Sequence, residues 1–305
     1  MPSYAIVGAS RGVGLEFVRQ LAADPAHVVL TFVRDPARSP HLAALVTNSR
    51  DHNIHVVQVD VVDDHRTLQV RAVLFSQYRM EIVVLTDDGR VQYAAVQVAQ
   101  VTDGALDMLM YSAARMNSES LFLRLDEYDD ADALDTEFLA AVRLPTNVLG
   151  FVHATNAFLP LLRARSMRKI VLLSSGAGDR AFVQRTALAE MAVYGATKAA
   201  ADMAMTKFAA QLEDERVRGG LPFTVVAMAP GQVDVSATAT NMPCPAAAAS
   251  LRRMTAHLLD ALPSFDARAL HPADAVQRLL ALLAALNTAD SGTVRPSTEV
   301  RAMPA

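Results

Sequence analysis

The sequence has one cysteine, three lysines, no long apolar run and no excess of basic residues. The single cysteine, Cys244, rules out a disulfide framework and a cysteine-based zinc site, and it fits a reducing compartment. The longest apolar run, Leu279 to Leu286, is far shorter than the roughly 20 residues that a membrane helix needs. The net charge is −4, so the composition does not indicate nucleic acid or an anionic membrane as a partner.

The N-terminal residues and the histidines argue against two further features, a signal peptide and a metal site. Tyr4 to Val7 already has the pattern of a strand and no basic segment precedes it, so we expect no signal peptide. The eight histidines are dispersed without a ligand spacing, so we expect no metal site. We therefore expect a soluble, cytoplasmic, globular protein without a nucleic-acid or membrane partner.

Apolar residues make up 52% of the 305 residues, enough for a large buried core. Apolar strands at Tyr4 to Val7, Val28 to Val33 and Ile54 to Val59 alternate with helical patterns at the spacing of βαβ units. Their apolar residues are continuous, which is typical of strands buried on both faces of a parallel sheet. The sequence thus predicts an α/β fold: a single Rossmann-type domain over residues 1–305, with a doubly wound parallel sheet and helices on both faces.

Later segments continue the alternation, with one ambiguous stretch. Val91 to Val101 fits a crossover helix, whereas Val91 to Val98 also fits the second strand of a hairpin that turns at Asp87-Asp88-Gly89. We favour the helix, because the next parallel strand then follows at Leu106 to Met110. The remaining patterns predict strands at Lys169 to Leu173 and Phe223 to Ala227, and helices at Phe138 to Leu162, Ala192 to Leu212 and Ala275 to Leu286.

A glycine-rich turn, with Gly8, Gly12 and Gly14, joins the first strand to the first helix. Glycine permits a tight turn and lets backbone N–H groups approach a pyrophosphate, which the positive end of the helix stabilises. Arg11 lies in this turn, and Arg34 follows the second strand, where the adenosine ribose of a dinucleotide would lie. An arginine there can pair with the 2′-phosphate of NADP, whereas an acidic residue would favour NAD. The alternative is an ordinary tight loop with two surface arginines.

Tyr194 and Lys198 lie four residues apart in a helical pattern, so their side chains project from one face. A nearby lysine ammonium favours the phenolate, so we expect a tyrosine pKa below its usual value of about 10, which suits a general acid or base. Ser174-Ser175 ends the preceding strand, at the edge of the sheet where α/β proteins bind ligands. Taken alone, this Ser-Ser pair is also a common turn sequence.

Together these segments resemble the short-chain dehydrogenase/reductase family over nearly the whole chain. Residues 7–14, VGASRGVG, are similar to its T-G-x3-G-x-G cofactor turn, and residues 230–233, PGQV, are similar to its P-G-x-V segment. Residues 14–21 and 33–36 are most similar to the C-factor-like branch of the family. The positions that resemble its Asn-Ser-Tyr-Lys catalytic tetrad and its adenine-binding aspartate are Asn147, Ser175, Tyr194, Lys198 and Asp60.

The resemblance implies hydride transfer between NADP(H) and a carbonyl or secondary alcohol. It implies that Tyr194 exchanges a proton with the substrate oxygen, while Lys198 tunes Tyr194 and holds the nicotinamide ribose. It also implies that Ser175 orients the carbonyl and that Asn147 holds a water linking Lys198 to solvent. The implied cofactor-binding residues are Gly8, Ser10, Arg11, Gly12, Val13, Gly14, Arg34, Asp60, Tyr194, Lys198, Pro230, Gly231 and Val233.

Several positions depart from the family pattern. Its N-N-A-G segment is YSAA at residues 111–114, and its first-turn threonine is Val7. In relatives these two positions brace each other across neighbouring strands, so losing both indicates a coordinated repacking. The threonine after P-G-x-V-x is Val235, for which Ser236 is the candidate substitute. The spacing from Ser175 to Tyr194 is 19 residues, longer than is common, which indicates a looped insertion at residues 179–190.

The leading hypothesis is an NADP(H)-dependent oxidoreductase for a small or medium-sized, weakly polar carbonyl or alcohol. Segment 236–269, rich in small apolar residues and methionine, would close the pocket as a lid. Met242, Leu251 and Met254 are candidates to line that pocket, although core packing suits each of them better.

Two further hypotheses stay open. One is a non-redox enzyme on the same scaffold, performing dehydration, isomerisation or cyclisation with Tyr194 as acid or base, because the YSAA segment departs from the family. The other is an NADP-binding regulator with little turnover. Helices around residues 147–162 and 192–212 would give the interface of a homodimer or homotetramer.

Overall fold

One parallel β-sheet forms the centre of the molecule. The computed structural model describes residues 1–49, 52–59, 70–73, 82–85, 90–143, 146–239, 245–263 and 268–297, with the backbone alone at 70–73, 82–85, 90–94, 140–143 and 246. Within this part of the chain, seven parallel strands lie in the order β3-β2-β1-β6-β7-β8-β9. Their bounds are β1 Ser3–Val7, β2 Val28–Val33, β3 Ile54–Gln58, β6 Met108–Tyr111, β7 Lys169–Leu173, β8 Thr224–Ala229 and β9 Val294–Pro296.

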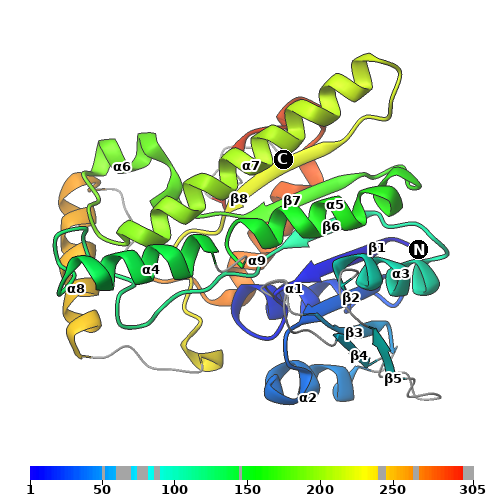
Figure 1. The fold of residues 1–305 in the computed structure, drawn as a ribbon, viewed down its shortest axis with the longest axis horizontal. Coiled ribbons are helices and arrows are strands. Elements are labelled where there is room, and N and C mark those ends of the chain that lie inside the picture. The colour runs from blue at the N-terminus through cyan, green and yellow to red at the C-terminus, as the bar shows by residue number, and fades with distance from the viewer. Residues whose placement is uncertain are drawn as a thin grey trace.

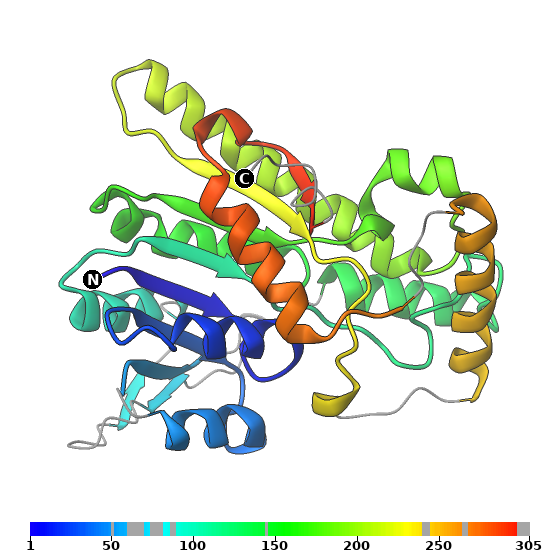
Figure 2. The ribbon, with the colours of Figure 1, turned by 180° about the vertical axis from the view of Figure 1, so that it is seen from behind.

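Helices cover both faces of the sheet, as the two opposite views show (Figure 1, Figure 2). One face carries a buried cluster with Phe151 and Phe158, and the other carries a cluster with Phe17 and Leu279. The strands bury side chains on both faces, which explains their continuous apolar runs. The predicted Rossmann-type α/β fold is confirmed. The first face holds α3 Arg90–Thr102, α5 Leu149–Arg163 and α7 Ala192–Val217; the second holds α1 Gly12–Leu21, α2 Pro40–Asn48 and α9 Pro272–Ala285.

The structure settles the choice between a helix and a hairpin strand after residue 90. The ambiguous stretch forms helix α3, which confirms the crossover helix, while the proposed turn at Asp87-Asp88-Gly89 lies outside the described residues. A separate antiparallel pair, β4 (Val70–Val73) with β5 (Ile82–Leu85), precedes it.

The single long helix expected at Phe138 to Leu162 is wrong, because the chain forms α4 (Ala131–Arg143) and then α5. Between them, the carbonyl of Thr146 accepts a hydrogen bond from the Tyr111 hydroxyl at 2.5 Å. The side chain of Asn147 is bonded to the backbone of Arg115. These bonds hold Thr146 and Asn147 in place between the two helices. The local signal for the break is Pro145, because proline cannot donate a helical hydrogen bond and disfavours a helical conformation of the residue before it.

The carboxyl ends of the parallel strands face the side of the molecule where α4, α6 (Arg180–Thr186) and α8 (Pro245–Ala261) gather (Figure 1, Figure 2). The order of the strands reverses between β1 and β6, and ligands of such sheets bind at this switch point beyond the carboxyl ends. Helix α6 occupies most of the insertion that was expected to be a loop. None of the helices in the described part of the chain has the length and apolarity that a membrane crossing requires. Short 3-10 turns complete the chain: η1 Pro36–Arg38, η2 Gly176–Gly178, η3 Ser236–Thr238 and η4 Thr288–Asp290.

Candidate active site

The four residues of the expected tetrad come together at the carboxyl edge of the sheet. Tyr194 and Lys198 project from the first turns of α7, and the Nζ atom of Lys198 lies 5.6 Å from the centre of the Tyr194 ring. Ser175, the second residue after β7, lies close enough to Tyr194 for its hydroxyl to act on the pKa of the phenol by hydrogen bonding. Asn147 lines the same small cavity as Tyr194.

A close approach between the turn after β7 and helix α7 brings Ser175 to the tyrosine. A Cβ atom added to Gly178 in that turn would lie 2.7 Å from the Cβ of Lys198. Only glycine therefore lets η2 pack this closely on α7. Lys198 also donates from Nζ to the carbonyl of Leu173, the last residue of β7, at 2.7 Å. Strand, turn and helix thus form one compact unit around Tyr194.

The ionisation of Tyr194 differs from the sequence prediction. Burial raises the pKa of Tyr194 to about 12, although the hydrogen bond from Ser175 acts to lower it. The expected lowering of the Tyr194 pKa is wrong, because burial and the negative charge of Asp202 raise that pKa by more than the Ser175 hydrogen bond lowers it. Tyr194 therefore carries its proton at neutral pH. A protonated phenol is the form that can donate a proton to a substrate oxygen.

Asp202 is a buried group of this site that motif reasoning missed. It lies four residues after Lys198 on α7, and its Oδ2 accepts a hydrogen bond from the Ser174 hydroxyl at 2.8 Å. Burial lowers the pKa of Lys198 to about 8, and the charge of Asp202 acts in the opposite direction. Burial likewise raises the pKa of Asp202 to about 6. At pH 7 both groups are therefore charged. The signal that could have found Asp202 is its spacing, which repeats the four-residue step from Tyr194 to Lys198.

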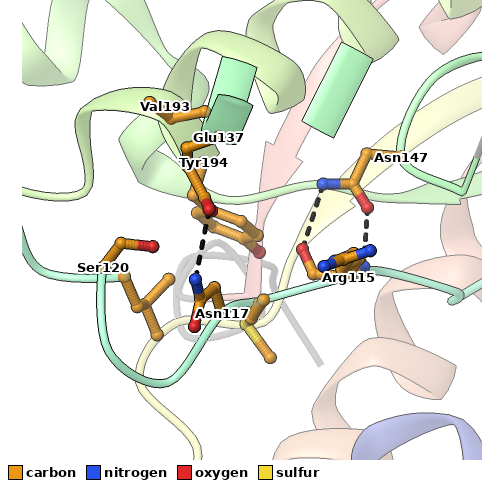
Figure 3. Close-up of a pocket in the computed structure, with 9 residues that line it drawn as sticks. Arg115, Asn117, Ser120, Glu137, Asn147, Val193 and Tyr194 are labelled. Atoms are coloured by element: carbon orange, nitrogen blue, oxygen red, sulfur yellow. Dashed lines mark hydrogen bonds between the residues drawn. The ribbon is translucent and has the colours of Figure 1, made fainter. Parts of the chain in front are cut away.

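The side chain of Asn147 is hydrogen-bonded both to the loop after β6 and to α7 (Figure 3). Its Oδ1 accepts from the backbone N–H of Arg115 at 2.7 Å, and its Nδ2 donates to the Arg115 carbonyl at 3.2 Å. Nδ2 also donates to the Thr197 hydroxyl of α7 at 3.1 Å. Both ends of the amide are therefore engaged by protein groups. Its side chain fixes the loop after β6 to the catalytic helix, so the water-holding role implied by the family stays a prediction.

The glycine turn has the features that a pyrophosphate requires. Gly8 has a φ of +88°, and a Cβ there would lie 2.5 Å from the backbone of Ala113 at the end of β6. Helix α1 begins after Arg11 with no side-chain cap and no acidic residue in its first turn. The first turn of α1 therefore holds no carboxylate that would compete with an anion, and the positive end of the helix favours one there. The residues present fit a nicotinamide dinucleotide.

A hydroxyl from the later part of the chain reaches this turn. The backbone N–H of Gly12 donates to the Thr238 Oγ1 at 2.9 Å, and a Cβ on Gly12 would lie 3.3 Å from Val235. The sequence suggested Ser236 as the replacement for the missing family threonine. The hydroxyl at the turn is instead that of Thr238. Ser236 begins the short helix η3 and Thr238 ends it, and the last of these residues contacts Gly12.

The altered positions of β1 and β6 are repacked together. Val7 and Tyr111 are register partners on these neighbouring strands. The Tyr111 ring packs edge-on against Phe151, with centroids 5.8 Å apart, and its hydroxyl bonds to the Thr146 carbonyl beside Asn147. An apolar partner at Val7 suits this aromatic ring, so the two departures form one coordinated change.

The remaining predicted cofactor residues lie around the same edge. Arg34 is exposed directly after β2, and Ser10 and Val13 belong to the glycine turn. Pro230, Gly231 and Val233 follow β8, where the Pro230 carbonyl accepts from Ser297 and Val233 pairs with Leu270. Asp60 lies outside the described residues.

A buried carboxylate ties together three segments around the mouth of the site. The side chain of Glu190, four residues before Tyr194, is fully buried, and its Oε1 accepts from Arg124 at 2.8 Å and from Arg253 of α8 at 3.3 Å. Arg253 also bonds to Glu127 at 2.8 Å. Burial acts to raise the pKa of Glu190, but the bonds from the arginines lower it below the usual range. Behind this cluster, Met254 packs with other apolar residues, namely Leu188, Leu258, Phe122, Phe182 and Leu251.

We expect the Glu190→Gln variant to lose about 2 kcal/mol or more of unfolding free energy, because two arginines would lose their shared buried counter-charge. Glu215→Gln is the matched control. Glu215 pairs with Arg163 at 2.7 Å on the surface, where such a pair is worth about 1 kcal/mol or less. Urea unfolding of both variants checks this, and equal losses would contradict a special role for Glu190.

A small cavity lies directly beside Tyr194 (Figure 3). Its volume of about 20 Å³ is enough for a single water-sized group. Leu251 and Met254 of α8 do not line it, since both pack in the apolar cluster behind the arginines. Met242 lies outside the described residues. The residues that line the cavity are Arg115, Met116, Asn117, Ser120, Leu121, Glu137, Asn147, Val193 and Tyr194.

Known proteins share both the sequence pattern and the fold. The family model described as short chain dehydrogenase matches residues 3–87 and 83–244. The short-chain dehydrogenase/reductase AacuF of Aspergillus aculeatus is 33% identical over 283 residues, which cover 93% of this chain and 92% of AacuF. The short-chain dehydrogenase/reductase atnB of an Arthrinium species is 31% identical over 251 residues, which cover 80% and 79%.

Solved structures show the same architecture. The NADPH-bound carbonyl reductase from chicken fatty liver superposes with a TM-score of 0.66 at 20% identity, covering 98% of this chain and 97% of that one. The carbonyl reductase Sniffer of D. melanogaster gives a TM-score of 0.66 at 18% identity, covering 97% of each chain. The protein is thus an oxidoreductase of the Rossmann-type class. It belongs to the short-chain dehydrogenase/reductase family.

Proposed function

We propose that the protein is an NADP(H)-dependent reductase of carbonyl compounds that also oxidises the corresponding secondary alcohols. The observation that carries the proposal is the meeting of Ser175, Tyr194 and Lys198 at the sheet edge that also holds the glycine turn. An intact acid–base pair in a chain with three lysines supports an enzyme over a regulator. Relatives named as reductases support the same conclusion.

The protein groups divide the work of carbonyl reduction. Ser175 holds the substrate oxygen by a hydrogen bond and polarises the carbonyl. Tyr194 donates its phenolic proton to the oxygen as negative charge develops there. Lys198, charged at neutral pH beside Asp202, stabilises the phenolate that remains. The nicotinamide, when bound, supplies the hydride for reduction or accepts it in the reverse direction.

Cofactor preference is the finer part of the proposal. Residue 33, at the end of β2, is valine, and Arg34 is exposed directly after it. An arginine at this place can pair with the 2′-phosphate of NADP by charge-assisted hydrogen bonds. NADPH-bound and NADP-bound members among the similar structures support this preference. We infer that Arg34 and Arg11 read the 2′-phosphate.

Further parts of the proposal concern the surroundings of the site. The segment 236–269 includes η3 and α8, and its bonds to Gly12 and Glu190 support a cover over the cofactor and substrate sites. The whole chain would act as a single domain in the cytoplasm. The outward faces of α5 and α7, which expose Leu149 and Met203, would join two or four copies.

Calorimetric titration with NADPH and NADH tests the proposed function directly. We expect NADPH to bind in the micromolar range and NADH to bind at least tenfold more weakly. A screen of ketones with NADPH then measures turnover. Failure of both dinucleotides to bind would overturn the proposal.

The Arg34→Ala variant should weaken NADPH binding about tenfold or more and change NADH binding less than threefold, because only NADPH has the 2′-phosphate. Arg218→Ala, at the far end of α7, removes the same charge away from the site and serves as control. Calorimetry with both cofactors measures the change. Equal losses for NADPH and NADH would show that Arg34 does not read the phosphate.

A further inference from the structure

The cavity beside Tyr194 has a polar wall formed by Asn117, Ser120 and Glu137 (Figure 3). Asn117 and Ser120 belong to the loop after β6, whereas Glu137 comes from α4. All three face the cavity that Tyr194 lines, so they lie where the part of a substrate next to its carbonyl would bind. These polar side chains favour a polar group on the substrate, whereas the composition of segment 236–269 predicts a weakly polar substrate.

Glu137 is held in place as a hydrogen-bond acceptor. Its Oε2 accepts from the Nδ2 of Asn117 at 3.1 Å. The Oδ1 of Asn117 in turn accepts from the backbone N–H of Glu119 at 3.2 Å, which fixes the orientation of the amide. A carboxylate has about four acceptor sites, so Glu137 retains capacity for a donor from a ligand.

Ser120 presents a hydroxyl that the described protein does not satisfy. Its Oγ is buried and has no hydrogen-bond partner among the described residues. Leaving a buried hydroxyl unpaired is costly, and such groups in native proteins are usually completed by water or by a ligand. The cavity that it lines has room for one water-sized group, which is also the size of a hydroxyl.

We propose that this polar wall binds a hydroxyl group of the substrate, so that the substrates are hydroxy-carbonyl compounds. The inference rests on the proposed reductase function, because it places the hydroxyl next to a carbonyl held by Ser175 and Tyr194. Glu137 accepts a hydrogen bond from the hydroxyl, and the Ser120 hydroxyl donates one to the hydroxyl oxygen. Arg115 lines the same cavity, and its positive charge disfavours an ammonium group there.

The physical consequence is discrimination against ketones that lack the hydroxyl. A site built to hydrogen-bond a hydroxyl rejects the analogue without it, because buried polar groups are then left unpaired. A site lined only by apolar groups would show the opposite order, since a hydroxyl would lose its hydration without compensation.

Matched ketones test the inference: acetophenone, its 2′-, 3′- and 4′-hydroxy derivatives, and the corresponding methoxy and amino compounds, each with NADPH. We expect the wild-type kcat/KM to be at least tenfold higher for one hydroxy isomer than for acetophenone. The matching methoxy compound, which cannot donate, should show no such gain. In the Glu137→Leu variant the ratio of hydroxy to plain ketone should fall to about one. Asp135→Leu, an exposed change on the same helix, should keep the wild-type ratio.

The outcomes separate the inference from the proposed function. Reduction of all ketones with equal kcat/KM would overturn the polar wall and leave the reductase standing. The amino compounds are neutral hydrogen-bond donors at pH 7, so a gain for them would agree with the wall. If NADPH binds but no ketone is reduced, the reductase proposal fails. In that case, calorimetric titration of the wild type and of Glu137→Leu with the hydroxy compounds tests the polar wall independently of turnover. Tighter binding that the variant loses supports the wall, and equal affinity overturns it.

Discussion

Replacing Tyr194 with phenylalanine should lower kcat/KM for carbonyl reduction by about 10² to 10⁴-fold, while the Kd for NADPH changes less than twofold. The variant keeps the ring and loses only the proton that the phenol donates, and general acid catalysis contributes a factor of this size. Steady-state kinetics and calorimetry measure the two quantities. Turnover close to that of the wild type would show that another group supplies the proton.

Tyr128→Phe is the matched control for this change. Its hydroxyl is also buried, and burial raises its pKa as well, but it is not among the residues that line the cavity of Tyr194. We expect its kcat/KM to stay within threefold of wild type. A loss as large as that of the Tyr194 variant would mean that buried hydroxyls act through stability rather than through chemistry.

The raised pKa of Tyr194 gives this prediction a dependence on pH. A pKa of about 12 means that the phenol is protonated across the neutral range, so the acid form needed for reduction is always present there. Reduction should therefore not decline with rising pH until the solution becomes strongly alkaline. Alcohol oxidation needs the phenolate as a base, so its rate should rise with pH over the same range.

The Gly8→Ala variant should lose about 1–3 kcal/mol more unfolding free energy than a glycine-to-alanine change at an open position. The new Cβ would lie 2.5 Å from the backbone of Ala113, so β1 or β6 must shift, and overpacking of this kind costs about 1–3 kcal/mol. NADPH binding should be lost as well, because the glycine turn moves with the strands. Urea unfolding and cofactor titration provide the measurements.

Gly219 supplies the control, since it separates the clash from the backbone strain. Its φ of +93° is close to the +88° of Gly8, but nothing lies within 4 Å of the position of its Cβ. Gly219→Ala should therefore cost only the strain of a positive φ, about 1–2 kcal/mol. Equal losses in the two variants would show that Gly8 is needed for its backbone angle alone and not for the contact with Ala113.

Much of the architecture follows from the sequence. The continuous apolar runs predict the buried parallel strands, because a strand covered on both faces has no polar side. The residues of the glycine turn and the spacing of Tyr194 and Lys198 predict which residues meet at the sheet edge, since local backbone geometry determines both. The break between α4 and α5 was missed although Pro145 signals it locally, because proline cannot donate a helical hydrogen bond and disfavours a helical conformation of the residue before it.

The sequence by itself determined the fold, through the periodicity of its apolar residues, and the family, through the motifs that resemble it. It also predicts the acid–base pair, through the four-residue spacing of Tyr194 and Lys198. Only the tertiary structure decided the ionisation of Tyr194, because the burial that raises its pKa depends on packing. The same holds for Glu190 and for the polar wall with Glu137. The partners of Glu190 and the neighbours of Glu137 come from distant segments of the chain. From the sequence alone, an acidic residue is expected to be a solvated surface group.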